Sequence, residues 1–553
     1  MRAFPTLIFL GVSFVLLRGV DPLLQIPAGT ETVATVPCFN LWTLAHNADQ
    51  IFRGGDYWNG RIFYPFESTF VLSEAQPNLL ILSPVSAIVS PVFAYNVYVY
   101  FSLTMNGVAG FLFARRNLHC SPSSATSNGV LLQLLPFVNL QLGVLQLIAI
   151  WPSLLFFHFL NRFVESGEKT NAAGTGLFFG VTYLCCNNYG LMAAIVGALV
   201  FGPTFLLSRN FFNRLPGIAL AILCSFFLTA PVVLEQLSVL GTPEFKRSAD
   251  TVAGLSAQLG DLLVSPWKDR LSIPGLASLR DRPLWGLSGG LIPYVLAVGG
   301  VIIGLQEPKL RRWTIILVAI SLVSAILSIV PGEGSLGKSW HLLLCKVIPG
   351  LSQIRSVYRF VVYFQIAVVC LAAIFLSGCE RRMVQSTSWF KGKLPVGAAF
   401  SVCLALCCTL EVFPDSTYVC TPPWQVDQPF CKWLREHCGQ EDAILCLPFQ
   451  PGTETSDYEQ EVAWMMAGRF HQRPIVNGYS GFFPADYLAV RREATLPLNA
   501  STVRRLKSIG VRFLSVKRDW IATTGKASLN EQIPDAEFVF NDAVNDVWIY
   551  QLL

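Results

Sequence analysis

Long apolar segments alternate with short polar ones from the N-terminus to about Pro414, and residues 414–553 are more polar. Runs of roughly 17 to 22 apolar residues are long enough to cross a hydrocarbon core about 30 Å thick as helices. The pattern therefore predicts about eleven transmembrane helices. They lie near Pro5–Val20, Tyr95–Phe113, Thr126–Val144, Leu145–Leu160, Ala172–Cys186, Leu191–Leu207, Leu215–Leu234, Leu287–Leu305, Trp313–Val330, Phe360–Ser377 and Leu394–Val412.

This pattern predicts two domains, a transmembrane domain over residues 1–413 and a C-terminal domain over 414–553. Two long polar stretches interrupt the first domain, at 21–94 and 235–286, and we interpret both as external loops. The first apolar segment begins like a signal peptide, but Arg18-Gly19-Val20-Asp21 follows it in place of a small-residue cleavage site. We therefore expect it to remain as a span.

Composition agrees with a membrane protein of many spans. Hydrophobic residues make up 53% of the chain, charged residues 14%, and mean hydropathy is +0.50. These values exclude an ordinary soluble enzyme of this length.

Charge predicts the orientation. With a cytoplasmic N-terminus, the short inside loops contain 14 Lys and Arg against four Asp and Glu, whereas the rest of the chain is net acidic. The positive-inside rule favours this arrangement, and an odd number of spans then places the C-terminal domain outside. The expected location is a bacterial inner membrane with a periplasmic C-terminal domain. The net charge of +5 thus reflects topology and gives no indication of nucleic-acid binding.

One apolar run, Leu79–Phe93, is too short for a span and contains Pro84 and Pro91. Proline removes a backbone donor and kinks a helix. We interpret the run as a juxtamembrane helix at the outer interface. A short kinked span is the alternative.

The C-terminal region has the periodicity of a mixed α/β domain. Residues 443–449, 511–517, 538–540 and 547–552 resemble strands, whereas 458–469, 485–494 and 501–509 have helical spacing. Gly510 is placed to end the last helix. The loop Asn477–Pro484 is rich in glycine and aromatic residues, so it either holds a sugar ring or forms a tight turn under aromatic packing.

Several motifs in the first external loop form a recognisable series. They are Phe39–Asp49, Gly54-Gly55-Asp56, Phe63-Tyr64-Pro65 and Ser73–Pro77, followed by the helix Tyr95–Phe113 with Ala114-Arg115-Arg116, the loop Ile348–Phe360 and the segment Ile475–Phe482. Together they resemble the glycosyltransferase C (GT-C) superfamily of integral-membrane enzymes. The resemblance implies the GT-C fold, a polyprenyl-phosphate-linked sugar donor and contact with membrane lipids.

The resemblance also indicates catalytic candidates. Superfamily members place an acidic residue at the start of the first amphipathic helix, where this chain has Asn40, which cannot act as a base. Asp21 and Asp49 are the nearest substitutes, and Glu74 occupies a position like that of the acidic residue before the interfacial helix. Each carboxylate also has an ordinary interpretation as a solvated or helix-capping group. Asp56 is expected to be a turn residue.

Cationic residues are expected at the departing phosphate. Arg355 and Arg359 are spaced to share one helix face, and arginine suits bidentate phosphate binding. The alternative is that they extend toward lipid headgroups, as arginine does at helix ends. Weaker candidates are Lys338, His341 and Lys346, and the Lys246-Arg247 pair is better explained as solvated charge. Asn40, Asn47 and Tyr479 are expected to help bind the substrate.

Metal and covalent chemistry have little support in the sequence. The six histidines form no metal-binding pair, and no Cys-x-x-Cys is present among fifteen cysteines. The resemblance allows a divalent ion held by first-loop carboxylates, and no other cofactor is implied. Cysteines 420, 431, 438 and 446 lie in a compartment that permits disulfides, and their pairing is left open. A direct Cys431–Cys438 bridge is excluded if both lie on one unbroken helix.

We therefore expect a membrane glycosyltransferase, transferring a hexose or pentose, with its site at the periplasmic face. Two alternatives come from other classes of protein function. One is a non-catalytic scaffold that binds glycolipid, which Asn40 favours. The other is a lipid or glycan transporter, which the lack of charged residues in the middle of the spans disfavours.

Overall fold

The computed structural model describes residues 4–66, 76–207, 211–240, 249–265, 267, 286–329, 335–348, 351–386, 396–415, 417–450, 452–481, 483–494, 498–518, 533 and 535–553. The chain divides into two compact units. The helical unit contains residues 1–19, 99–230 and 246–417, and the mixed unit contains residues 20–98, 231–245 and 418–553.

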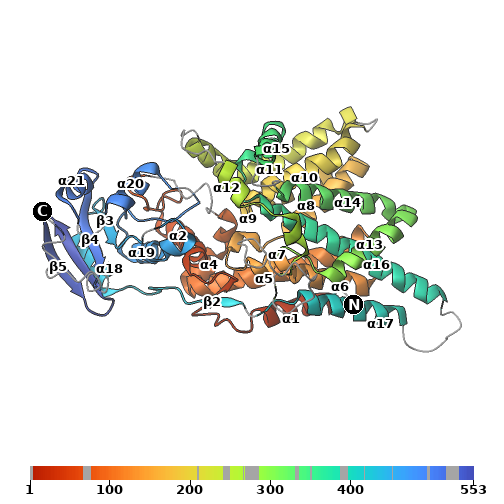
Figure 1. The fold of residues 1–553 in the computed structure, drawn as a ribbon, viewed down its shortest axis with the longest axis horizontal. Helices are drawn as coiled ribbons and strands as arrows, with labels where there is room; N and C mark the ends of the chain where they lie inside the picture. Colours follow the sequence, from red (N-terminus) through yellow and green to blue (C-terminus); the bar gives the residue numbers. More distant parts are fainter. Residues whose placement is uncertain are drawn as a thin grey trace. The chain divides into compact units, whose positions relative to one another are not determined.

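The helical unit is a bundle (Figure 1). Its helices are α1 (Phe4–Leu16), α5 (Pro91–Arg116), α6 (Pro122–Gln133), α7 (Pro136–Leu140), α8 (Trp151–Ser166), α9 (Lys169–Cys185), α10 (Asn187–Leu206), α11 (Phe211–Leu240), α12 (Ala249–Gly254), α13 (Leu291–Gln306), α14 (Pro308–Ser328), α15 (Ser335–Val347), α16 (Val361–Ser386) and α17 (Val396–Val412). The division between the units falls within α5 and α11.

Helix α16 is the centre of this bundle, and it packs against α6, α13, α14 and α17. Most of its apolar side chains are buried. Gly300 of α13 lets the two backbones approach closely, since a Cβ there would lie 1.9 Å from the Leu371 carbonyl oxygen. Small residues permit such close helix contacts in membranes.

Six helical segments in the described part are long and apolar enough to cross a membrane. They are Pro91–Arg116, Leu145–Ser166, Asn187–Leu206, Phe211–Ser238, Pro308–Ser328 and Val357–Met383, and the shorter apolar helices are Phe4–Leu16, Pro77–Ile88, Leu291–Gln306 and Gly397–Val412. By the length and composition of these helices, the chain is a membrane protein. The predicted number of about eleven transmembrane helices is not confirmed.

The prediction of a single span over Thr126–Val144 is wrong. Helix α6 ends at Gln133, and the five-residue helix α7 begins at Pro136. Pro136 has no backbone N–H to continue the helical hydrogen bonding and restricts the residue before it, so the two helices are separate.

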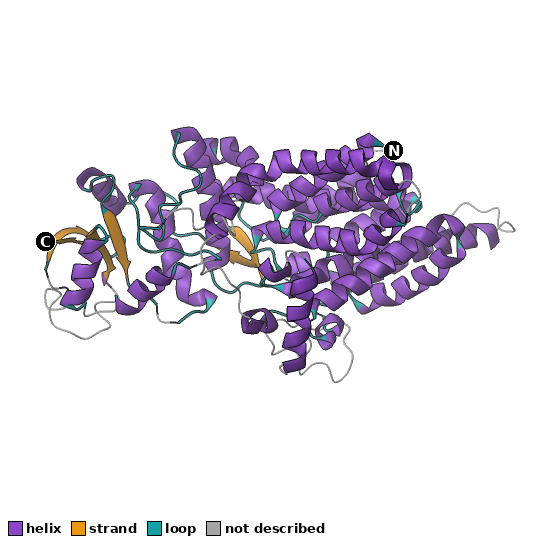
Figure 2. Cartoon of the chain, turned by 90° about the horizontal axis from the view of Figure 1, so that it is seen from above, coloured by secondary structure: helices purple, strands orange, loops and turns teal. Residues whose placement is uncertain are grey.

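The mixed unit contains both sheets found among the described residues (Figure 2). Strand β1 (Ile26–Gly29) pairs antiparallel with β2 (Tyr418–Cys420). The second sheet has the order β3-β4-β6-β5, with β3 (Ala443–Leu447) parallel to β4 (Val511–Lys517). Strands β5 (Ala536–Asp542) and β6 (Val547–Leu552) complete it in antiparallel pairing.

Four helices accompany this sheet, namely α18 (Pro429–His437), α19 (Glu459–His471), α20 (Ala485–Glu493) and α21 (Ala500–Ser508). Each strand and helix predicted between residues 443 and 552 has a counterpart here. Asn499 caps α21 through its side-chain oxygen, which accepts from Thr502 N at 2.7 Å. Gly510 follows α21 with φ +95°, a conformation that favours glycine.

The first loop and the C-terminal region fold together in the mixed unit. Tyr64 N donates to Ile475 O at 3.0 Å, and Ile475 N donates to Arg61 O at 2.9 Å. Thr35 Oγ1 donates to Thr455 O at 2.8 Å. The predicted domain ranges 1–413 and 414–553 remain a prediction. The contacts above group residues 20–98 with the C-terminal region in one compact unit.

The predicted juxtamembrane helix is broken into short pieces. The 3-10 helix η1 (Pro77–Leu82) leads into α4 (Ser83–Ile88), and α5 begins at Pro91. Ile81 and Ile88 are 75% and 82% exposed. Exposed apolar side chains on short helices suit contact with lipid, which agrees with an interfacial position.

Candidate functional site

Helix α2 (Thr35–Arg53) of the first loop provides one wall of a cavity in the mixed unit. Pro37 lies in its first turn, where the missing N–H costs little. The helix ends at Arg53 and is capped by Gly54, whose φ of 68° lets its N–H bond to Gln50 O. Residues Thr35–Ala48 are buried, with the interior position Val36 half-buried, and the last turn emerges from the core. This emergence places the polar end of α2 at the cavity.

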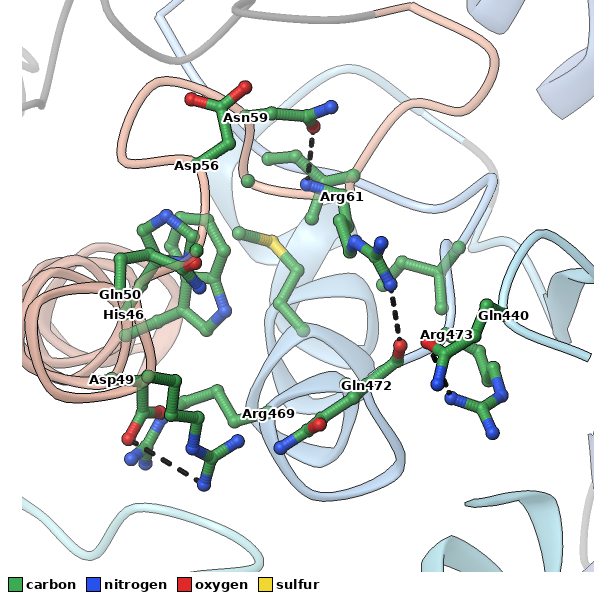
Figure 3. Close-up of a pocket in the computed structure, with 18 residues that line it drawn as sticks. His46, Asp49, Gln50, Asp56, Asn59, Arg61, Gln440, Arg469, Gln472 and Arg473 are labelled. Atoms are coloured by element: carbon green, nitrogen blue, oxygen red, sulfur yellow. Dashed lines mark hydrogen bonds and ion pairs between the residues drawn. The ribbon is translucent and has the colours of Figure 1, made fainter. Parts of the chain in front are cut away.

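The cavity has a volume of about 300 Å³ and is lined by the first loop and by the region around α19. Trp42, His46, Asp49, Gln50, Arg53, Gly55, Asp56, Asn59, Gly60, Arg61 and Ile62 come from the first loop, and Gln440, Met465, Gly468, Arg469, Gln472, Arg473 and Ile475 from the C-terminal region. Figure 3 shows His46, Asp49 and Gln50 projecting from α2.

Asp49 is held by an ion pair across the sequence. Its Oδ2 accepts from Arg469 Nε at 2.9 Å, and its Oδ1 lies 3.9 Å from Arg53 Nη2. The side chains of Arg469 and Asp49 are only 12% and 21% exposed. A partly buried pair of this kind is screened less by water than a surface pair. Asp49 is one of the acids predicted to replace the carboxylate missing at Asn40. The structure shows its ion pair with Arg469, and its catalytic role remains untested.

His46 is a neutral group inside this wall. Burial lowers the pKa of His46 to about 4, although a hydrogen bond with the Tyr57 backbone opposes the shift. Its ring stacks on Trp42 with centroids 5.1 Å apart. At neutral pH the imidazole therefore offers a polar, uncharged edge to the cavity.

The facing side of the cavity carries arginine and amide groups. Arg61 donates from Nη1 to Gln472 O at 2.8 Å, and its side chain is 43% exposed. Arg473 is buried and donates to Cys438 O, Gln440 Oε1 and Arg435 O. Amide, guanidinium and carboxylate groups beside an aromatic ring are the groups that bind hydroxyl-rich ligands.

Asn40 takes part in an amide–amide contact. Its Oδ1 accepts from Gln76 Nε2 at 2.8 Å, and its Nδ2 donates to Val36 O at 3.0 Å. Both amides are buried, at 1% and 6% exposure. Glu74, two positions before Gln76, lies outside the described residues. Its predicted role as a catalytic carboxylate therefore stays a prediction.

The other predicted first-loop residues have structural contacts. Asp21 Oδ1 accepts from Leu23 N at 2.8 Å and from Leu24 N at 3.1 Å, which fixes a turn. Asp56 Oδ1 accepts from Trp58 N at 2.9 Å, so the predicted turn role of Asp56 is confirmed.

The two remaining substrate-binding candidates, Asn47 and Tyr479, do not line the cavity. Asn47 is fully buried in α2. Tyr479 packs edge-on against Phe39 with centroids 5.3 Å apart. A Cβ at Gly478 would lie 2.6 Å from the Phe63 ring, so the loop matches the interpretation of a tight turn under aromatic packing.

The expectation that Arg355 and Arg359 share a helix face is wrong. Arg355 lies in a bend, and Arg359 lies in the 3-10 helix η6 (Val357–Phe360), which begins after Arg355. Arg355 is exposed, whereas Arg359 is half-buried with its guanidinium 6.0 Å from the Tyr358 ring centroid. A role of either residue in phosphate binding remains untested. Of the weaker candidates, Lys338, His341 and Lys346 lie in α15, and Lys246-Arg247 lies outside the described residues.

Among the described residues, no group of three or more His, Cys, Asp or Glu side chains could hold a metal ion. The predicted divalent ion, held by first-loop carboxylates, stays a prediction. Sequence reasoning missed that His46, Arg469 and Arg473 line the same cavity as the predicted acid Asp49. The helical spacing of 458–469 placed Arg469 at a helix end, but no local signal indicated a partner 420 positions away.

Comparison with solved structures identifies the fold. The arabinofuranosyltransferase AftD from mycobacteria aligns with 100% of this chain and 39% of its own, at TM-score 0.58 and 14% identity. The apo oligosaccharyltransferase of Archaeoglobus fulgidus aligns with 94% of this chain and 70% of its own, at TM-score 0.51 and 12% identity. This chain thus spans about two fifths of the length of AftD. No protein-family model and no curated protein matches it. The chain has a GT-C-like fold.

Proposed function

We propose that this chain is an integral-membrane glycosyltransferase that moves a sugar from a polyprenyl-phosphate carrier to an acceptor at the periplasmic face. The observation that carries the proposal is the GT-C-like fold, which extends over the whole chain. AftD and the archaeal protein are both named as glycosyl-transferring enzymes. Fold alone does not establish activity, so the residues must support the chemistry.

The reaction needs a base and an anion-stabilising group. A carboxylate, for which Glu74 is our candidate, accepts the proton of the acceptor hydroxyl. At the same time the oxygen of that hydroxyl forms a bond to C1 of the sugar. The bond between C1 and the carrier phosphate oxygen breaks, and the carrier phosphate leaves with that electron pair. Arg355 and Arg359 are our candidates for stabilising this phosphate. Gln76 supports the assignment of Glu74, because its bond to Asn40 ties the segment directly after Glu74 to α2.

The polar cavity is our candidate for the acceptor-binding site. Its volume of about 300 Å³ is at the lower end of the range for small-molecule pockets. Arg53 is half-exposed at its edge, and Asp49 at 3.9 Å is its ion-pair partner. A side chain held this loosely is free to bind a ligand hydroxyl or carboxylate.

The test is sugar transfer in purified membranes, with a panel of radiolabelled polyprenyl-phosphate hexoses and pentoses. We expect one donor to label an acceptor in membranes that contain the protein and not in membranes that lack it. Arg53→Gln should raise the acceptor KM several-fold, whereas Arg504→Gln, an exposed arginine of α21, should leave it unchanged. No transfer from any donor contradicts the proposal.

A second function, a non-catalytic scaffold that binds glycolipid, is favoured by one observation. The position where the GT-C resemblance expects an acid holds the buried Asn40–Gln76 amide pair, which cannot accept a proton at neutral pH. Binding of a polyprenyl-phosphate sugar without transfer would support the scaffold.

A further inference from the structure

Two thiols meet inside the mixed unit although 382 positions separate them in the chain. Cys38 is the fourth residue of α2, and Cys420 is the last residue of β2. Their sulfur atoms are 3.4 Å apart, and the two residues are 2% and 8% exposed. The pairing of β2 with β1, in which Cys420 is opposite Ile26, holds Cys420 in place.

The two sulfurs are close enough for a disulfide to form after a small movement. A disulfide requires them to approach to about 2.05 Å, about 1.4 Å less than their present separation of 3.4 Å. Cysteines 431, 438 and 446 are also buried, and Cys431 Sγ lies 3.6 Å from Ala467 O. Of the cysteines in the mixed unit, Cys38 and Cys420 have the sulfur–sulfur contact that the structure records.

We propose that Cys38 and Cys420 form a disulfide that fastens helix α2 to strand β2. The proposal goes beyond the catalytic assignment and rests only on the periplasmic placement of this unit. Compartments outside the cytoplasm permit such bonds. Because α2 carries Asn40 and Asp49, the bond would fix the helix that provides one wall of the cavity.

The chemistry is thiol–disulfide exchange with a periplasmic disulfide donor while the unit folds, before burial closes access. One of the two cysteines, as its thiolate, attacks a sulfur of the donor disulfide to form a mixed disulfide. The other cysteine then attacks the protein sulfur of that mixed disulfide, and the donor leaves as a dithiol that has gained two electrons and two protons.

The test is peptide mapping of the full-length protein, with free thiols blocked by N-ethylmaleimide at cell lysis. Chymotrypsin cleaves after Phe39, Tyr418 and Trp424, so it separates Cys38 and Cys420 from every other cysteine. Without reductant we expect one linked peptide pair, which dithiothreitol should split into two. Recovery of both peptides as N-ethylmaleimide adducts, or of Cys420 joined to a different cysteine, would overturn the proposal.

A stability measurement adds an independent readout. Cys38→Ser, Cys420→Ser and the double variant should lower Tm by the same amount, because each removes the same bond. Dithiothreitol should lower the Tm of the wild type and leave that of the variants unchanged. Additive losses in the double variant would contradict a shared bond. External labelling of the mixed unit in intact cells tests its placement separately from the enzymatic activity.

Discussion

Asp49 in the first loop and Arg469 at the end of α19 form an ion pair, with Asp49 Oδ2 accepting from Arg469 Nε at 2.9 Å. The pair joins two segments separated by 420 positions and lies in the wall of the polar cavity. A carboxylate held this way has two possible roles, as a structural tie or as a base, and substitution of each partner separates them.

If Asp49 is a structural tie, Asp49→Asn and Arg469→Gln should destabilise the protein similarly, by about 1–3 kcal/mol each, because either change leaves a partly buried partner without its charge. The double variant should cost less than the sum of the two. Thermal unfolding in detergent measures this. If Asp49 is instead the base, Asp49→Asn should lower turnover by about 100-fold or more while Arg469→Gln does not.

Arg359 provides a test of carrier binding. Arg359→Lys should weaken binding of polyprenyl phosphate about tenfold, because an ammonium loses the bidentate fork and the contact with Tyr358. Arg355→Lys should have a similar effect if both arginines bind the phosphate. Arg382→Lys, near the end of α16 that is expected on the cytoplasmic side, is the control and should bind normally. Unchanged affinity in both test variants would reduce Arg355 and Arg359 to membrane anchors.

Glu461 in α19 should make stability depend on pH. Burial raises its pKa to about 7, although Arg491, with Nε 3.3 Å from Glu461 Oε1, opposes the shift. Since the ordinary value is 4.5, the folded protein keeps between pH 4.5 and 7 a proton that the unfolded chain has lost. This contribution is fully present below pH 4.5 and is lost as pH rises through 7.

Glu461→Gln removes the titrating group. Relative to the wild type, the variant should therefore gain stability between pH 5 and pH 8, by at most about 3 kcal/mol. Tm measured at both pH values checks this. An equal Tm difference between variant and wild type at the two pH values would show that Glu461 does not titrate in this range.

The sequence predicted the elements whose determinants are local. The alternation over Val511–Lys517 and the stop at Gly510 correspond to β4 and to the end of α21. Apolar runs located the long helices. The single span predicted over Thr126–Val144 is wrong because Pro136 lacks a backbone N–H, which a hydropathy pattern does not detect.

Tertiary relationships could not be predicted in this way. Nothing near Asp49 specifies Arg469, and the pairing of β1 with β2 depends on a partner almost 400 positions away. Arg355 and Arg359 have the spacing of residues on one helix face, but η6 starts only at Val357, so Arg355 lies before the helix and Arg359 within it. The sequence therefore identified the chemistry of single residues better than which residues meet.

Sugar transfer should depend on a carboxylate at Glu74. Glu74→Gln keeps the shape and hydrogen bonding of the side chain but cannot accept a proton at neutral pH. Asp21→Asn and Asp49→Asn test the other two candidates, and Glu67→Gln is the matched control in the same segment.

The decisive measurement is the rate of transfer from the preferred polyprenyl-phosphate sugar in membranes containing equal amounts of each variant. Glu74→Gln should lower the rate by about 100-fold or more, the low end for loss of a general base, while carrier binding and the Glu67→Gln control stay near wild type. Wild-type turnover in Glu74→Gln would contradict the catalytic assignment of this residue.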